Sequence, residues 1–160
     1  MFACVTGHRP SKLGGYHNFN FDSLVKFAED HITQLTKEHN ITHWYIGMAL
    51  GWDMACAQAC VNLSIPYVAC VPFAGYTDNW RSADEQLWMR LCRQAKSVIF
   101  TSDPGFTVTK LMIRNRYMVN RSKLVLALHD GSDGGTGKCV KHAHSVGKTV
   151  INVWSNYVKV

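Results

Sequence analysis

Hydrophobic and polar positions follow two patterns along the chain: short, nearly continuous apolar runs, and longer stretches with an apolar stripe at helical spacing. The apolar runs predict six strands, at residues 2–6, 44–48, 67–71, 97–101, 123–128 and 149–153. The striped stretches predict helices at residues 21–38, 54–63, about 82–95, 110–121 and 136–146. Strands without a polar face are typical of a sheet that is covered by helices on both sides.

The alternation of strands and helices predicts the fold class. It indicates a single α/β domain over residues 1–160, with a mainly parallel sheet of about six strands and helices on both faces. Ligands of such sheets bind outside the carboxyl ends of the strands. Functional residues are therefore expected in the loops that follow the strands.

Local signals refine these elements. Asp22 or Ser23 is expected to cap the first helix, and Gly147 to end the last one. The loop at residues 7–16 contains three glycines and a proline, which predicts no regular element there.

Composition narrows the function classes. The net charge of +6 and the pI near 9.1 favour an anionic partner, which includes both nucleotides and nucleic acid. No run approaches the roughly 20 apolar residues of a membrane span, and no signal peptide is recognisable, so we expect a cytoplasmic protein without a membrane partner. The six cysteines lie in apolar or helical contexts, which favours reduced, buried thiols. No Cys/His set has zinc spacing, and we predict neither a metal nor a cofactor.

The glycine-rich stretch from Asp130 to Lys138 lies between a predicted strand and a predicted helix. Backbone N–H groups at such a helix start bind anions, and we assign Gly134, Gly135 and Thr136 to this role. The stretch matches neither GxxxxGK[ST] nor GxGxxG. A glycine-rich turn without a ligand is the alternative.

The loop after the first strand contains Thr6, Gly7, His8 and Arg9. Gly7 lets a ligand approach the backbone, and Arg9 can bind a phosphate with two parallel hydrogen bonds. His8 can donate to an oxyanion or serve as a general acid or base. The alternative is a loop histidine beside a solvent-facing arginine.

The loop after the second strand contains Gly47, Gly51 and Asp53. Gly51 can form a tight turn, and Asp53 lies at the predicted helix start. Its carboxylate can cap the helix, hold a ribose hydroxyl, position a cation or act as a base.

Aromatic residues and Arg81 follow the third strand. Phe73, Tyr76 and Trp80 can stack on a base while Arg81 reaches a phosphate; alternatively, the rings fold onto the core or into a subunit contact. Arg114 and Asn115 lie in the first turns of the predicted helix 110–121, where they face either the crevice or solvent.

Taken together, these motifs resemble the YpsA-like branch of the SMF/DprA–LOG (SLOG) superfamily. Thr6-Gly7-His8-Arg9-Pro10 with Lys12 to Tyr16 resembles the opening motif of that branch, and Gly47 to Asp53 resembles its second motif. Arg114-Asn115-Arg116 matches the segment before the fifth strand, and Asp130 to Thr136 resembles the closing motif. The resemblance covers almost the whole chain.

The resemblance implies a Rossmann-like domain that binds a nucleotide or a nucleotide-derived ligand, and carriage of some members by phages or mobile elements. The LOG branch cleaves nucleoside monophosphates with a glutamate in a PGGxGTxxE motif. Here Gly134-Gly135-Thr136-Gly137 is followed by Lys138-Cys139-Val140-Lys141, without a carboxylate in the first helical turn. Whether the protein is an enzyme therefore stays open.

Three hypotheses follow. The first is a binding module that captures an ADP-ribose-like or cyclic nucleotide signal, as a sensor or by sequestering it. The second is a hydrolase of a glycosidic or phosphate bond that uses Asp53, Asp130 or His8 for acid/base chemistry. A single-stranded nucleic-acid binder is less favoured, because the basic residues form no continuous stripe. We also expect a homo-oligomer.

Overall fold

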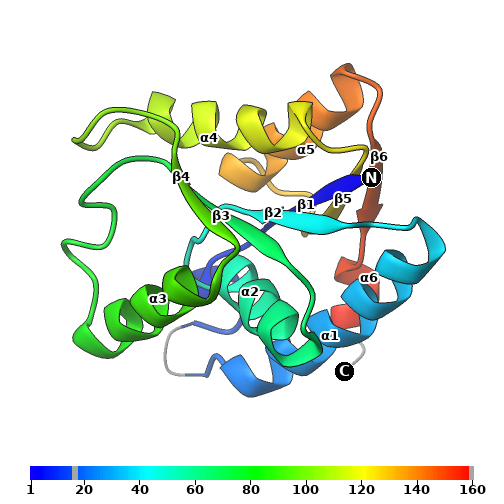
Figure 1. The fold of residues 1–160 in the computed structure, drawn as a ribbon, viewed down its shortest axis with the longest axis horizontal. Coiled ribbons are helices and arrows are strands. Elements are labelled where there is room, and N and C mark those ends of the chain that lie inside the picture. The colour runs from blue at the N-terminus through cyan, green and yellow to red at the C-terminus, as the bar shows by residue number, and fades with distance from the viewer. Residues whose placement is uncertain (16–17, 159–160) are drawn as a thin grey trace.

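The computed structural model describes residues 1–15 and 18–158; Tyr16, the last residue of the opening motif, lies outside the described residues. The described chain forms one six-stranded sheet in which every pairing is parallel, with the order β4-β3-β2-β1-β5-β6 (Figure 1). The strands are β1 (Phe2–Gly7), β2 (His43–Ile46), β3 (Tyr67–Val71), β4 (Ser97–Phe100), β5 (Leu124–Leu128) and β6 (Thr149–Asn152). The predicted α/β fold with a parallel sheet is confirmed.

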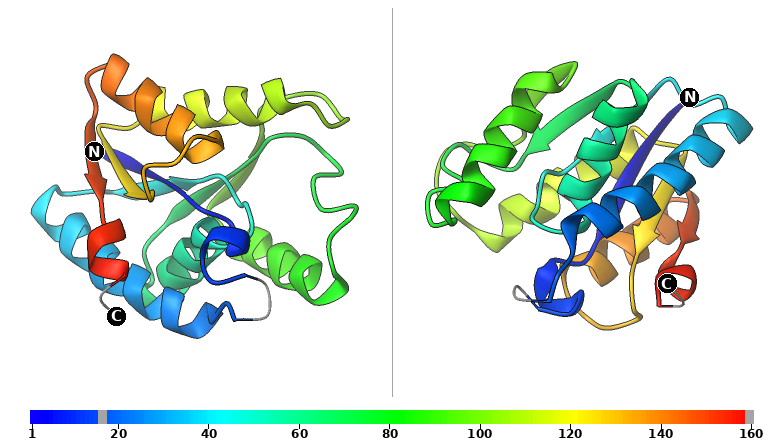
Figure 2. Two further views of the ribbon diagram at one scale, coloured as in Figure 1. Left: turned by 180° about the vertical axis from the view of Figure 1, so that it is seen from behind. Right: turned by 90° about the horizontal axis from the view of Figure 1, so that it is seen from below.

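Helices cover both faces of the sheet (Figure 2). On one face lie α1 (Phe21–Glu38), α2 (Trp52–Leu63) and α3 (Ser82–Gln94). On the other face lie α4 (Val108–Asn120) and α5 (Gly135–Ser145). A short helix, α6 (Trp154–Tyr157), follows β6 and lies beside α1, where the rings of Phe27 and Tyr157 are 5.6 Å apart. The strand pattern at 149–153 did not indicate α6.

Each face has its own apolar core. The larger core contains Trp44 and Ile46 of β2 and packs them against the buried side of α1 and α2. The smaller core joins Cys4 and Val125 of the central strands to Met118 of α4 and Ala143 of α5. Because both faces are buried, β3 and β5 are apolar along their whole length.

The direction of chain progression across the sheet reverses between β1 and β5. From β1 the chain proceeds through β2 and β3 to β4 on one side, and then returns to β5 and β6 on the other. Such a reversal opens a crevice at the carboxyl ends of the two central strands, because their connections diverge to opposite faces. The fold therefore places the loops after β1 and β5 beside one crevice.

Some helix and strand boundaries differ from the predicted ones because of the local backbone conformation or a different capping residue. The second strand ends at Ile46 because Met48 adopts a positive φ of 62°. The first helix is capped by the Asn20 side chain, which accepts the Ser23 N–H at 3.0 Å, and the predicted cap at Asp22 or Ser23 was wrong. Gly147 has a φ of 74° directly after the C-cap of α5, as predicted.

The loop after β1 contains a 3₁₀ turn, Pro10–Lys12, where no regular element was predicted. Pro10 favours this turn because its ring fixes φ near the helical value at the first position. The Arg9 carbonyl accepts the Lys12 N–H at 3.0 Å, and the Pro10 carbonyl accepts the N–H groups of Leu13 and Gly15. The turn gives a regular backbone to a segment that carries two potential ligand contacts, Ser11 and Lys12.

Within the described residues, no helix is long and apolar enough to cross a membrane. All six cysteines are described and are free thiols; Cys92 is half-buried and the other five are buried.

Candidate nucleotide site

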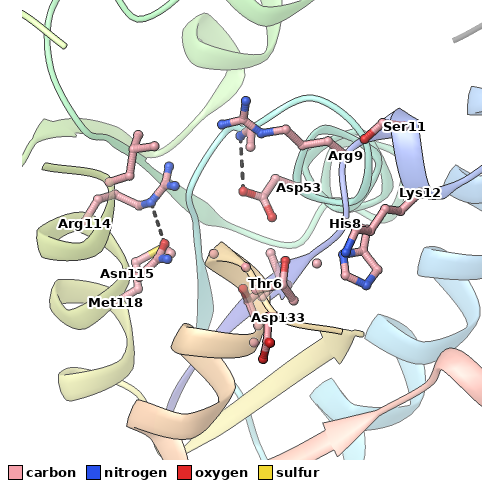
Figure 3. Close-up of a pocket in the computed structure, with 18 residues that line it drawn as sticks. Thr6, His8, Arg9, Ser11, Lys12, Asp53, Arg114, Asn115, Met118 and Asp133 are labelled. Carbon is pink, nitrogen blue, oxygen red and sulfur yellow. Dashed lines mark hydrogen bonds between the residues drawn. The ribbon is translucent and has the colours of Figure 1, made fainter. Parts of the chain in front are cut away.

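The candidate site is a cavity at the reversal point of the sheet, with a volume of about 240 Å³. Four separate segments line it: the β1 loop, the start of α2, the middle of α4 and the start of α5 (Figure 3). The predicted residues that line it are Thr6, Gly7, His8, Arg9, Asp53, Arg114, Asn115, Gly134, Gly135 and Thr136. Gly47, Gly51, Arg81 and Asp130 lie outside its lining.

Asp53 places a buried carboxylate at the wall of the cavity. Its side chain is in the first turn of α2, and Oδ2 accepts the Ala49 N–H at 3.1 Å across the loop. Burial raises the pKa of Asp53, while the positive charge of Arg114 and the Ala49 hydrogen bond oppose that rise. Asp53 does not act as the N-cap, because Gly51 occupies that position without a side-chain bond.

Arg114 is the buried cation of the site. Only 5% of it is exposed, because α4 directs it inward between the sheet and the loop after β2. Its Nη1 donates to the Gly47 carbonyl, and its Nε donates to Asn115 Oδ1 at 2.8 Å. These bonds fix the guanidinium plane and so keep its charge close enough to Asp53 to favour the ionised carboxylate.

Gly47 and Gly51 support the site from behind its lining. A Cβ on Gly47 would lie 2.9 Å from Arg114 Nη1, so only glycine leaves space for the guanidinium. Gly51 has a φ of 93°, and its Cβ would lie 2.6 Å from the His8 carbonyl oxygen. These two glycines therefore act by close packing against residues that do line the cavity.

The start of α5 lies at one end of the cavity. Gly134 has a φ of 140° and precedes the first helical turn, in which the N–H groups lack intrahelical partners. Lys12 also lines this cavity, and its Nζ donates to Ser132 Oγ, which links the β1 loop to the β5 loop. A helix N-terminus and a lysine together favour a phosphate here.

His8 and Asp130 form a pair beside the cavity. His8 Nε2 lies 2.9 Å from Asp130 Oδ1 and 3.0 Å from the Asp130 backbone nitrogen. Burial lowers the pKa of His8, and this outweighs the opposite effect of the Asp130 carboxylate. Hydrogen bonds from the Ser132 side chain and backbone hold the pKa of Asp130 well below its ordinary value. At neutral pH the pair is therefore a neutral imidazole beside a carboxylate.

The loop after β3 meets the site only at its rim. Arg9 Nη2 donates to the Tyr76 hydroxyl at 3.3 Å, whereas Arg81 Nε pairs with Asp84 Oδ2 at 3.1 Å on the surface. The rings of Tyr76 and Trp80 are 5.4 Å apart, and Trp80 packs against the larger core. These aromatics line no part of this cavity in the described structure, which favours the alternative in which they fold back.

Several lining residues were not predicted from the sequence; they are Val5, Ser11, Lys12, Ala49, Leu111, Met118, Asp133 and Gly137. Leu111 and Met118 could have been found, since they lie three residues before and four after Arg114 on the same helical face. Ser11, Asp133 and Gly137 carry no such periodic signal, because they lie in turns or at a helix start.

Sequence comparison relates these loops to a known family. The YpsA family model, described as the YspA SLOG family, matches residues 3–150. The chain belongs to this SLOG family. Among curated proteins, it is 32% identical over 140 residues to the SPbeta prophage-derived protein YoqJ of Bacillus subtilis (strain 168), covering 76% of this chain and 78% of that protein.

Solved structures with the same fold are less similar in sequence to this SLOG protein than YoqJ is. The structure of TM1055 aligns with a TM-score of 0.60 and 14% identity, over 93% of this chain and 71% of that one. DNA processing protein A from Helicobacter pylori, whose structure concerns single-stranded DNA binding, aligns with a TM-score of 0.63 and 15% identity. That alignment covers 94% of this chain and 63% of the other. At these identities the likeness establishes the fold alone.

Proposed function

We propose that this SLOG domain binds the ribose-phosphate part of a nucleotide-derived ligand in the cavity between β1 and β5. Membership of the SLOG family supports a nucleotide-related binding domain. One observation carries the finer proposal: the N-terminus of α5, with its unpaired N–H groups, and the buried Asp53 carboxylate line the same cavity. A phosphate binds to the N–H groups of a helix N-terminus, and a ribose hydroxyl donates to a carboxylate such as that of Asp53.

The charges in the cavity assign a role to each wall. The N–H groups at Gly135 and Thr136 and the ammonium of Lys12 bind the phosphate. Asp53 accepts from a ribose hydroxyl, because Ala49 holds Oδ2 in place and the charge of the nearby Arg114 favours the ionised carboxylate. Arg9, which is exposed at the rim, neutralises a second phosphate or the outer part of the ligand.

The cavity is large enough to enclose only a small part of the ligand. Its volume of about 240 Å³ is below the roughly 300–1,000 Å³ of sites that enclose a drug-sized ligand. A single ribose phosphate is therefore enclosed, and the rest of an ADP-ribose-like or cyclic nucleotide ligand extends past Arg9 and Tyr76. The prophage-derived relative supports a role on a mobile element, in which the domain senses or sequesters a nucleotide signal.

Calorimetric titration against nucleoside monophosphates, ADP-ribose and cyclic nucleotides tests this proposal. We expect micromolar binding of at least one phosphate-containing ligand, weakened tenfold or more by Lys12→Met and by Asp53→Asn. Arg93→Ala, an exposed position on α3, is the matched control and should leave the affinity unchanged. Dissociation constants above one millimolar for every ligand would refute the proposal, and tight binding of a single-stranded oligonucleotide alone would favour the nucleic-acid hypothesis.

A hydrolase is the second candidate, favoured by the raised pKa of Asp53. A buried carboxyl whose pKa is shifted toward neutrality can transfer a proton in a glycosidic cleavage. α5 provides no acidic residue in its first turn, so the LOG-type glutamate has no counterpart there. Mass spectrometry of a bound nucleotide after incubation tests this candidate: turnover that is lost in Asp53→Asn, with binding retained, would support it, and an unchanged ligand would exclude it.

A further inference from the structure

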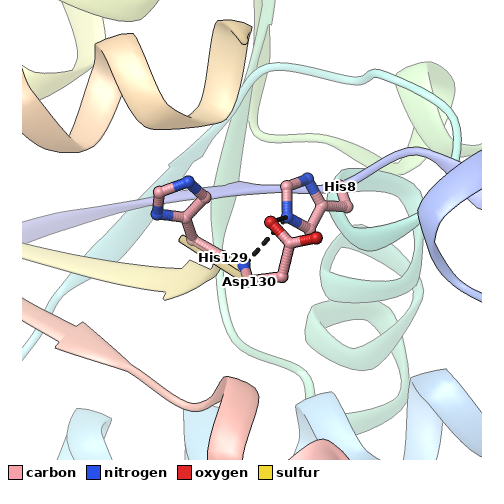
Figure 4. A group of neighbouring side chains, drawn as sticks. All are labelled: His8, His129 and Asp130. Carbon is pink, nitrogen blue, oxygen red and sulfur yellow. Dashed lines mark hydrogen bonds and ion pairs between the residues drawn. The ribbon is translucent and has the colours of Figure 1, made fainter. Parts of the chain in front are cut away.

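Three side chains that can bind a metal converge beside the cavity. They are His8, which follows β1, and His129 and Asp130, which follow β5 (Figure 4). One nitrogen of each imidazole and one carboxylate oxygen all lie within 4.8 Å of one another. No sequence pattern indicated this cluster, because His8 and Asp130 are 122 residues apart. Pairing of Gly7 with Leu128 brings the two loops together.

The hydrogen bonds around His8 do not satisfy both of its neighbours at once. Nε2 lies 3.0 Å from the Asp130 N–H, which requires a lone pair on the nitrogen, and 2.9 Å from Asp130 Oδ1, which requires a proton. A neutral imidazole has either a lone pair or a proton on Nε2. With the lone pair, Nε2 faces the lone pairs of Asp130 Oδ1; with the proton, it faces the Asp130 N–H. A cation bound to both Nε2 and Oδ1 would replace the contact between their lone pairs with two metal–ligand bonds, and the Asp130 N–H would give up its bond to Nε2.

We propose that His8, His129 and Asp130 form a binding site for a divalent transition-metal ion such as Zn²⁺. Two imidazoles and one carboxylate are a ligand set that Zn²⁺ and its first-row neighbours accept, whereas Mg²⁺ and Ca²⁺ favour oxygen ligands. Ligands about 2.0–2.1 Å from a tetrahedral ion are roughly 3.3 Å from one another. The separation of 2.9 Å between His8 and Asp130 is close to this value, and His129 needs to move by no more than about 1.5 Å.

Neighbouring groups already orient the ligands. His129 Nε2 contacts the Ser132 carbonyl at 2.8 Å, and Asp130 Oδ1 accepts the Ser132 N–H at 2.9 Å. Metal-binding imidazoles and carboxylates in proteins are usually held by such bonds. Lys12, which contacts Ser132 Oγ, places a positive charge nearby and works against a cation. Removing that charge should therefore tighten metal binding.

The experiment uses the full chain after removal of metal with EDTA, without nucleotide. Titration with Zn²⁺ by calorimetry should give one ion per chain, and His129→Gln and Asp130→Asn should each weaken binding at least tenfold. His144→Gln, an exposed histidine of α5 outside the cluster, should bind as the wild type does. Lys12→Met should bind at least as tightly, and Mg²⁺ should not compete.

Equal Zn²⁺ affinity in the wild type, His129→Gln and Asp130→Asn would overturn the proposal and indicate an adventitious ion only, as would loss of binding in His144→Gln. X-ray absorption of the wild-type Zn²⁺ protein gives a test that needs no folded variant: two imidazole nitrogens support the site, and none refutes it. Nucleotide titrations of His129→Gln in EDTA distinguish failure of the metal proposal from failure of the nucleotide proposal. His129 lies outside the cavity lining, so this variant should retain nucleotide binding while losing the metal.

Discussion

The guanidinium of Arg114 on α4 is hydrogen-bonded to the backbone carbonyl of Gly47, in the loop after β2. The bond crosses the carboxyl end of the sheet and joins two motifs that are 67 residues apart. Because Arg114 is buried and its charge acts on Asp53, this contact sets the electrostatics of the cavity. Substitutions at either end should therefore change both folding and ligand binding.

Gly47→Ala should displace Arg114. The added Cβ would lie 2.9 Å from Nη1, which is closer than real Cβ contacts, and a tight 3.0 Å from Cζ, so the guanidinium has to shift. We expect a loss of about 1–3 kcal/mol in the free energy of unfolding, the usual cost of overpacking, together with weaker nucleotide binding. Urea denaturation and calorimetry measure the two effects.

Gly135→Ala is the matched control for stability. No described atom lies within 4 Å of a Cβ at this position, and its φ is not in the left-handed region. Alanine at a compatible site stabilises by about 0.4–1 kcal/mol because it restricts the unfolded chain. If Gly47→Ala were as stable as Gly135→Ala, the close contact with Arg114 would be unimportant.

Arg114→Met should destabilise the protein by about 1–3 kcal/mol, because it leaves the buried Gly47 carbonyl without a donor. It also removes the positive charge that favours the ionised form of Asp53. The double variant with Asp53→Asn should lose less than the sum of the single variants, since the two sites interact. Strict additivity in urea denaturation would contradict a coupling between them.

Thr107→Ala should loosen the start of the helix that carries Arg114. Thr107 is the N-cap of α4, and its Oγ1 accepts the Lys110 N–H at 3.2 Å. Loss of such a cap costs about 0.5–2 kcal/mol. Thr109→Ala, at an exposed position two residues later, supplies the control and should change the free energy of unfolding by less than about 0.5 kcal/mol. Equal effects of the two alanines would show that the cap is unimportant.

Much of the fold could be predicted because its signals are local. The residues of α1 and β3 carry strong apolar patterns, and both elements have the predicted bounds of 21–38 and 67–71. Start positions depended on caps and turns that the apolar pattern does not encode. Thus α4 begins at Val108 rather than Lys110 because Thr107 caps it, and α2 begins at Trp52 rather than Met54.

The site was predictable to the level of loops but not of contacts. The carboxyl ends of parallel strands share one edge, so the loops carrying Thr6, Asp53 and Gly134 were expected to meet, and they line one cavity. The partners of Arg114 and of His8 depend on how separate segments pack. No pattern in the sequence indicates that Arg114 bonds to Gly47, or that His8 faces Asp130 instead of solvent.

Asp53 in the cavity and Asp130 beside it should respond to pH in opposite directions. The pKa of Asp53 is raised in the native state above its ordinary value of 3.8, so between that value and the raised pKa the native protein binds more protons than the unfolded chain. Stability contributed by the protonated form is complete below pH 3.8 and declines as the pH rises through the raised native pKa. Asp53→Asn removes this loss, and its stability relative to the wild type should therefore increase as the pH rises from 3.8 toward the raised native pKa of Asp53, and stay constant above it.

The contribution of Asp130 to stability should have the opposite pH dependence. Its native pKa is depressed by hydrogen bonds from Ser132, so its contribution to stability is present above the ordinary value of 3.8 and is lost as the pH falls below that value. Asp130→Asn should thus be less stable than the wild type at pH 7, and the difference should shrink in acid. Urea denaturation in EDTA at pH 3, 4, 5.5 and 7 measures both variants. A stability difference for Asp53→Asn that does not change with pH would mean that the buried carboxyl keeps its ordinary pKa, and the acid/base role considered for it would then lose its basis.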